Sequence, residues 1–120
     1  MSTIKLAEST VNFVVATLKA EASVQKRWVA TADMLRADGV TSEILAKDED
    51  FRKSFKSGVI LLSFTAAEQK IMAKPHTSLS DEEKITKRWV QQQMGVRLAR
   101  VQQYVKKAED EENMSDDERG

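Results

Sequence analysis

A long amphipathic helix is predicted by residues 80–108, which read SDEEKITKRWVQQQMGVRLARVQQYVKKA. Ser80 and Glu83 have the spacing of a capping box, and the acids after Ser80 suit the positive end of a helix dipole. Beyond them an apolar residue recurs every three or four positions, as one buried helix face requires. These positions are Val90, Met94, Leu98, Val101, Val105 and Ala108. We expect the helix to begin at Asp81 and to end near Glu112.

Gly95 interrupts the apolar pattern of this helix. A glycine within a helix costs up to about 1 kcal/mol relative to alanine, so Gly95 predicts either a kink or a close approach by another helix.

Charge is strongly segregated along this part of the chain. Residues 84–107 carry seven Lys or Arg and no acid, whereas residues 109–118 carry seven acids. The whole chain of 120 residues sums to a net charge of zero. A charged ligand, however, responds to the local field within a Debye length, roughly 8–10 Å at physiological salt. The segregation therefore indicates binding to something polyanionic or acidic.

The basic stretch also carries side chains that suit nucleic acid. Lys and Arg neutralise phosphates, and Gln forms hydrogen bonds that tolerate different sequences. A solvated helix face that happens to lack acids would have the same composition, and this alternative stays open. The candidate contact residues are Lys84, Arg88, Trp89, Gln92, Arg97, Arg100, Gln103, Lys106 and Lys107.

Trp89 lies away from the main apolar stripe, together with Ile85 and Val96. It is either part of a second buried face or an exposed aromatic that stacks on a base or fills a partner's pocket. We expect it to be buried. The same string, Lys-Arg-Trp-Val, occurs at residues 26–29, where Trp28 lies on an apolar seam and is expected in the core.

The N-terminal third also has helical periodicity. Apolar residues at spacings of three and four run from Ile4 to Leu35 and predict a helix from about Thr3 to Asp38, which Gly39 would end. Two polar residues, Glu21 and Gln25, fall on the seam of this helix, so a kink or an end near Ala22–Ser23 is the alternative.

Shorter helices are predicted across residues 42–74. Thr41 or Ser42 can cap the first, Asp48 or Asp50 the next, and Thr65 with Glu68 forms a capping box for a third that Pro75 ends. The expected core stripe of this region is Phe51, Phe55, Val59 and Leu62. No pair of segments with period-two alternation exists, so the fold class is all-α: an irregular helical bundle with long N- and C-terminal helices and shorter central helices.

Length and composition predict one helical domain over residues 1–112 and a disordered acidic tail over residues 113–120. The apolar seams of the two long helices exceed what the middle segment covers. They predict a homo-oligomer formed through residues 4–35 or 90–108. The chain has no cysteine, no signal-peptide pattern and no apolar run of membrane-spanning length, which predicts a cytoplasmic protein without a membrane partner.

Catalytic and metal-binding motifs are missing from the sequence. His76 is the only histidine, and no nucleophile-elbow or glycine-rich phosphate motif occurs. We therefore expect no enzyme, no cofactor, no metal and no small-molecule substrate. The acids of residues 48–50 could hold a hard cation loosely, but their position before Phe51 is more typical of helix capping.

Two functions follow from the charge pattern. The first is non-enzymatic association with nucleic acid through the phosphate-binding Lys/Arg/Gln face of the last helix, with the acidic tail moderating the affinity. The alternative is a protein-interaction module, an adaptor or inhibitor, that docks a charged protein surface through the same helix with Trp89 as anchor. Such a compact, cysteine-free chain with a charged tail is typical of viral and bacteriophage accessory proteins.

Overall fold

The protein consists of helices, and the part of the chain described by the computed structural model contains no strand. Backbone is described for residues 5–20 and 25–117, and side chains up to residue 112. The α-helices are α1 (Glu8–Lys19), α2 (Gln25–Ala37), α3 (Ser42–Lys47), α4 (Glu49–Phe55), α5 (Ala66–Ala73) and α6 (Asp81–Asp117). A π-helical turn, η1 (Lys56–Ile60), and two 3-10 turns, η2 (Leu61–Ser63) and η3 (His76–Ser78), complete the order. The predicted all-α class is confirmed.

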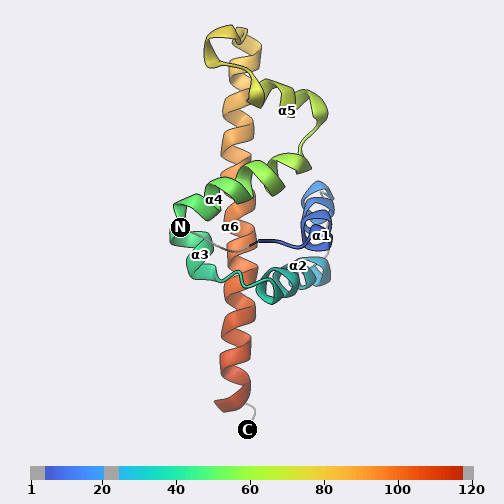
Figure 1. Ribbon diagram of the computed structural model, residues 1–120, viewed down its shortest axis with the longest axis vertical. Coiled ribbons are helices and arrows are strands. Elements are labelled where there is room, and N and C mark those ends of the chain that lie inside the picture. Colours follow the sequence, from blue (N-terminus) through green and yellow to red (C-terminus); the bar gives the residue numbers. More distant parts are fainter. Residues whose placement is uncertain (1–4, 21–24, 118–120) are drawn as a thin grey trace.

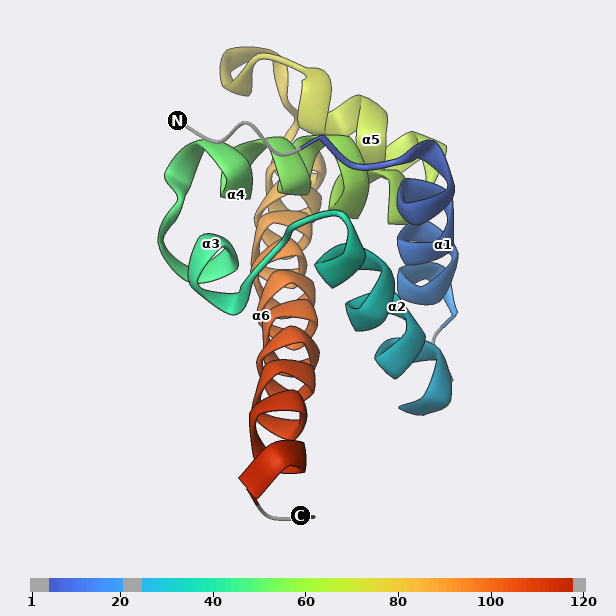
Figure 2. The same cartoon turned by 60° about the horizontal axis from the view of Figure 1, so that its bottom comes forward.

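Helix α6 is the long central helix along which the other helices are arranged, and we call it the spine of the molecule (Figure 1). Its 37 residues rise about 55 Å at 1.5 Å per residue, which accounts for most of the 60 Å length of the fold. Helices α2, α3 and α5 and the π turn η1 all contact α6. Figure 2 shows α1 and α2 on one flank of this spine and α3 and α4 on the other.

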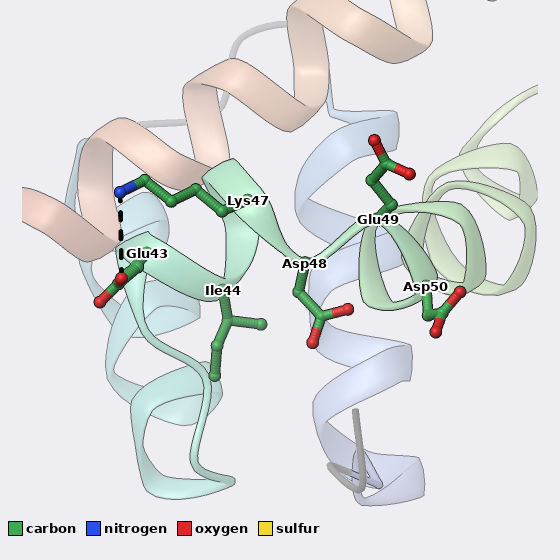
Figure 3. A pocket seen from close by; sticks show the side chains of 6 residues that line it. All are labelled: Glu43, Ile44, Lys47, Asp48, Glu49 and Asp50. Atoms are coloured by element: carbon green, nitrogen blue, oxygen red, sulfur yellow. Dashed lines mark ion pairs between the residues drawn. The ribbon is translucent and has the colours of Figure 1, made fainter. Parts of the chain in front are cut away.

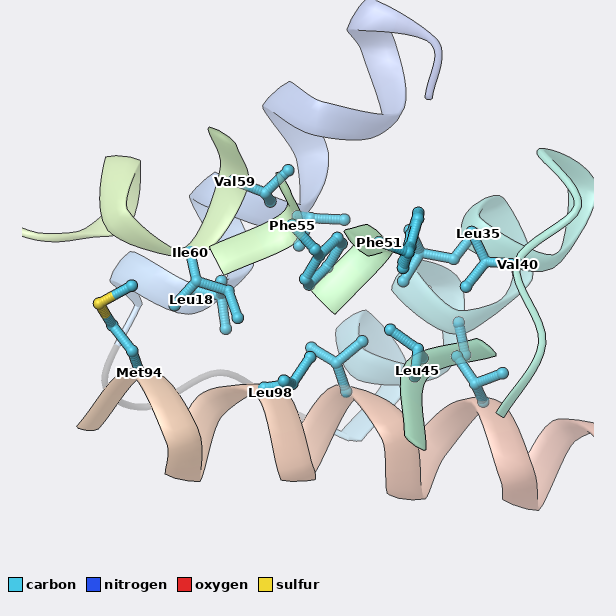
Figure 4. Packing of buried hydrophobic residues seen from close by; sticks show 14 of the residues in the cluster. Leu18, Leu35, Val40, Leu45, Phe51, Phe55, Val59, Ile60, Met94 and Leu98 are labelled. Carbon is cyan, nitrogen blue, oxygen red and sulfur yellow. The ribbon is translucent and has the colours of Figure 1, made fainter. Parts of the chain in front are cut away.

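One stripe of α6 supplies its share of the hydrophobic core. Val90, Leu98, Val101 and Val105 are almost completely buried, and Met94 is nearly so. Figure 4 shows Met94 and Leu98 pointing from α6 toward the apolar side chains of the central helices. The opposing side chains include Leu18, Leu35, Leu45, Phe51, Phe55, Val59 and Ile60. The apolar stripe predicted for the last helix is therefore the interior face of α6.

The helix boundaries follow local capping chemistry. Gly39 adopts a φ of 95°, and the N–H groups of Gly39 and Val40 donate to the carbonyls of Arg36 and Leu35, each at 3.0 Å. This pattern is a Schellman motif, in which glycine takes the left-handed position after a helix. Gly39 therefore ends α2, as predicted.

Side chains cap the helices that follow. Thr41 accepts a hydrogen bond from the Ile44 N–H at 3.2 Å, and Asp48 accepts one from the Phe51 N–H at 3.0 Å. Both predicted capping boxes are present, Thr65 with Glu68 and Ser80 with Glu83. Helix α5 ends at Ala73, before Pro75, as predicted.

The N-terminal apolar seam belongs to two helices instead of one. Helix α1 ends at Lys19 and α2 begins at Gln25, so the predicted continuous helix to Asp38 is wrong. The alternative position for an end, Ala22–Ser23, lies outside the described residues. The two helices pack on each other, which lets both bury their apolar faces against the same core. In this contact the buried Thr31 hydroxyl donates to the Thr17 hydroxyl at 3.1 Å.

The π turn corrects the predicted core stripe of the central segment. Phe51, Phe55 and Val59 are buried as expected, but Leu62 is 41% exposed and Ser63 is buried in its place. A π turn accommodates one more residue than an α turn. The inward positions after residues 56–60 are consequently shifted by one.

The predicted close approach of another helix at Gly95 is wrong, and a kink at this residue stays a prediction. Helix α6 is continuous through this residue, and a Cβ added there would meet nothing within 4 Å. No described helix passes close to it.

The predicted oligomer would have to use other surfaces than the two apolar seams. The described residues of both seams pack into the core of the same chain. Oligomerisation therefore stays a prediction, and these two seams are not its interfaces.

Among the described residues, none of the helices has both the length and the apolar character needed to span a bilayer. The predicted disordered tail, residues 113–120, lies outside the described side chains, while the backbone of α6 continues to Asp117, beyond the expected end near Glu112.

Candidate nucleic-acid interface on the C-terminal helix

The predicted contact residues lie on the sides of α6 that the core leaves uncovered. The buried stripe spans roughly 80° of the helix circumference at 100° per residue, and the basic and amide side chains occupy much of the remaining arc. Eight of the nine candidates are exposed: Lys84, Arg88, Trp89, Gln92, Arg100, Gln103, Lys106 and Lys107. The ninth, Arg97, is half-buried. The helix therefore presents these eight side chains to solvent together.

Carboxylates of the fold leave most of these cations uncompensated. In the described part of the chain, Lys84, Arg88, Arg100 and Lys107 form no ion pair. The Nζ of Lys106 lies 3.9 Å from Oδ1 of Asp110, one helical turn away, and both side chains are exposed. Such an exposed pair contributes little, and salt screens it. The positive charge is thus available to a ligand.

Arg97 is held in place by the end of the central segment. Its Nη1 donates to the Ser63 hydroxyl at 2.6 Å, and its guanidinium lies 4.0 Å from the centre of the Phe64 ring. A cation over an aromatic face is stabilised by the ring quadrupole. Arg97 therefore links α6 to the last residue of η2 and to the residue after it, in addition to contributing charge.

The prediction that the Trp89 side chain is buried is wrong. Its side chain is 45% exposed and touches Phe64 edge-on, with ring centres 6.0 Å apart. Ile85 and Val96 are also exposed, by 68% and 49%. At 100° per residue the three fall within about 40° of one another, opposite the buried stripe. The core does not need this second apolar stripe, because the other helices pack on the first.

A cavity of about 330 Å³ lies beside Trp89, between α6 and the first two helices. Its lining combines two indole rings, two guanidinium groups and one amide with small apolar side chains. The lining residues are Leu18, Ala20, Trp28, Trp89, Gln93, Val96, Arg97 and Arg100. We call it the Trp28–Trp89 cavity. It brings together three of the predicted contact residues: Trp89, Arg97 and Arg100.

Trp28 forms the inner wall of this cavity. It is 6% exposed, as its place on the apolar seam predicted. Its ring stacks on Tyr104 with centres 5.6 Å apart, and the Arg100 guanidinium lies 5.6 Å from the Trp28 ring centre. The charge of Arg100 is thus placed beside an aromatic surface.

A second hollow continues along α6 from the first. It measures about 480 Å³ and is lined by Val96, Ala99, Arg100, Gln102, Gln103 and Lys106. The two hollows share Val96 and Arg100. Together they form a continuous uneven surface of basic, amide and apolar groups on one side of the helix.

Sequence reasoning missed Gln93 and Trp28 as members of this site. Trp28 lies 61 positions before Trp89 and reaches the cavity only because α2 packs on α6. The repeated string Lys-Arg-Trp-Val was the one available signal, since both of its tryptophans line the same cavity.

The beginning of the acidic stretch has a structural role. The Glu109 carboxylate accepts the Ser42 N–H at 2.9 Å and the Ser42 hydroxyl at 2.5 Å, and Glu112 pairs with Arg36. Burial opposes the ionisation of Glu109. The two bonds from Ser42 and the charges of Arg36 and Lys106 outweigh it and lower the Glu109 pKa. The hydrogen bond that the Arg36 guanidinium donates to the Glu112 carboxylate in turn raises the pKa of Arg36.

The acids at residues 48–50 do not converge on a cation site. Asp48 caps α4, and Figure 3 shows the Glu49 carboxylate pointing away from those of Asp48 and Asp50. Glu43 and Lys47, on the same open surface, form an ion pair. Within the described residues, no group of three acids or histidines could hold a metal ion.

Comparisons with protein-family models, with curated proteins and with solved structures find no match to this chain. The functional inference rests on the residues of α6 and of the Trp28–Trp89 cavity.

Proposed function

We propose that the protein binds nucleic acid through the outer face of α6, chiefly by contacting phosphates. The observation that carries the proposal is the set of exposed cations on one helix, of which Lys84, Arg88, Arg100 and Lys107 have no described carboxylate partner. Each phosphate contact releases condensed counterions, which makes such binding favourable at low salt. Gln92 and Gln103 add hydrogen bonds between the charges.

The spacing of the cations suits a polymer better than a single anion. Lys84 and Lys107 are 23 residues apart, which corresponds to about 35 Å along a helix. A ligand that contacts both must be extended and must repeat its negative charge. A nucleic-acid backbone has this property along its whole length.

The test compares two triple variants of equal charge. Lys84→Gln, Arg88→Gln and Lys107→Gln remove three cations from the proposed face. Lys19→Gln, Lys53→Gln and Lys70→Gln remove three exposed lysines from α1, α4 and α5. We expect labelled oligonucleotides at 50 and 200 mM salt to bind the first variant more weakly and with a lower salt slope, by about 0.7 per lost contact for a single strand.

The control variant should bind like the unaltered protein. Equal weakening of both variants would show that net charge alone acts, without a defined face. Absence of binding to single- and double-stranded DNA and RNA at 50 mM salt would overturn the proposal.

Protein docking is a second candidate, favoured by the exposed stripe of Ile85, Trp89 and Val96. Tryptophan and arginine are enriched among residues that dominate binding energy at protein interfaces. The fitting partner is an acidic surface, as presented by a host protein that an accessory protein inhibits or recruits. Its test is capture of a partner from the native cell that Trp89→Ala abolishes and that Ile44→Ala, on α3, does not.

A further inference from the structure

We propose that the Trp28–Trp89 cavity takes one unpaired nucleobase of a strand bound along α6. The inference rests on the proposed function and adds the ligand class: single-stranded nucleic acid. Its starting point is the lining of the cavity, in which aromatic, cationic and amide groups meet within about 330 Å³.

The size of the cavity suits a small planar ligand. Pockets for small molecules measure about 300–1,000 Å³, so this one lies at the lower end of the range. It has room for one base, while the attached sugar and phosphate remain outside. The exposed Arg100 at its edge is positioned to receive that phosphate.

The side chains provide the two interactions that a base needs. The half-exposed Trp89 ring offers a face for stacking, an interaction that every base makes and that tolerates different sequences. Gln93, half-buried in the wall, carries an amide with both donors and an acceptor for the edge of the base. Trp28, which is buried and stacks on Tyr104, forms the inner side of this wall.

An unpaired base fits this site better than a duplex does. In a duplex, the base faces are stacked on one another and only the edges are accessible in the grooves. The lining of the cavity comes from α1 and the residue after it, from α2 and from α6, so its ligand must enter between helices. A base turned out of a single strand can do so, and the apolar Val96 beside Trp89 matches a base face better than it matches phosphate.

The experiment uses the full chain and three 12-mers: single-stranded oligo(dT), an abasic strand with the same phosphates, and a duplex. The protein's two tryptophans both line the cavity, so quenching of intrinsic fluorescence reports on its occupation. Anisotropy of end-labelled strands reports total binding. We expect oligo(dT) to bind about 5- to 150-fold more tightly than the abasic strand, which is the affinity that one stacked base contributes. Among the three ligands, only oligo(dT) should strongly quench the tryptophan fluorescence.

Two variants with one control separate the base contact from the phosphate contacts. Trp89→Ala and Gln93→Ala should each reduce the preference for oligo(dT) over the abasic strand. Gln91→Ala should retain it, because Gln91 is exposed on the same helix but does not line the cavity. Circular dichroism checks that each variant is folded.

The outcomes distinguish the two proposals. If all three 12-mers bind equally and Gln93→Ala behaves like Gln91→Ala, the base pocket is disproved and phosphate binding by α6 is retained. If the duplex binds more tightly than oligo(dT), the inference is likewise overturned. If no 12-mer binds at 50 mM salt, the proposed function fails as well.

Discussion

The Glu109 carboxylate receives both the N–H and the hydroxyl of Ser42, at 2.9 and 2.5 Å. These residues are 67 positions apart, and their contact fastens the start of α3 to α6. The N–H of Ser42 is one of the groups at a helix start that has no partner within its own helix. A residue of the acidic stretch thus caps a distant helix.

Replacing Glu109 should destabilise the fold. We expect Glu109→Ala to lower the free energy of unfolding by about 1–3 kcal/mol, because a charged acceptor is lost and the Ser42 donors remain. Urea denaturation measures the change. Glu111→Ala is the matched control, since Glu111 is an exposed acid of the same helix, and it should change stability by less than about 0.5 kcal/mol.

Acid should remove the contribution of Glu109. Its pKa in the folded protein is below the usual value of about 4.5, so its stabilisation is complete above that value and is lost as the pH falls through the lowered pKa. Thermal denaturation from pH 6 to pH 3 should show the gap between the unaltered protein and Glu109→Ala closing at the acidic end. A gap that stays constant would contradict the assignment.

Two glycines should respond oppositely to alanine. At Gly95, alanine meets no neighbouring atom and should raise the free energy of unfolding by up to about 1 kcal/mol through helix propensity. At Gly39 the space is equally open, but φ is 95°, and the left-handed conformation should cost about 1–2 kcal/mol. Paired urea titrations measure both changes. Destabilisation by Gly95→Ala would indicate a contact outside the described residues.

Truncation should separate the two parts of the acidic stretch. Deleting residues 113–120 removes more acids than bases and should therefore tighten oligonucleotide binding at 50 mM salt. The effect should be much smaller at 200 mM salt, since salt screens exposed charges. Deleting residues 109–120 should also lower the thermal midpoint, because Glu109 and Glu112 contact Ser42 and Arg36. Unchanged binding after the shorter deletion would show that the tail does not moderate affinity.

Helix ends were predictable because they depend on neighbouring residues. A capping box needs only four consecutive positions, and both Thr65 with Glu68 and Ser80 with Glu83 act as predicted. The stop at Gly39 is equally local. The apolar stripe of α6 was predictable for a related reason, since its period is the helix period itself.

Features set by tertiary packing were not predictable in the same way. The apolar periodicity runs through both α1 and α2, so it could not show that the two helices fold back on each other. The π turn before Leu62 leaves no mark on the local pattern. Trp89 was expected to be buried, yet the fully buried stripe of α6 lies on the other side of the helix and Trp89 is 45% exposed. The cavity depends on the meeting of Trp28 with Trp89, which only the fold reveals.

Because one late helix supplies a whole wall of the core, the order of synthesis matters for this protein. Translation releases the first 80 residues before α6, and domains generally fold as units once their parts are available. Until Leu98 and Val101 leave the ribosome, Leu45, Phe55 and the other core residues of the preceding helices lack the part of the apolar cluster that α6 supplies. The nascent chain is therefore most exposed to aggregation and to chaperones just before α6 appears.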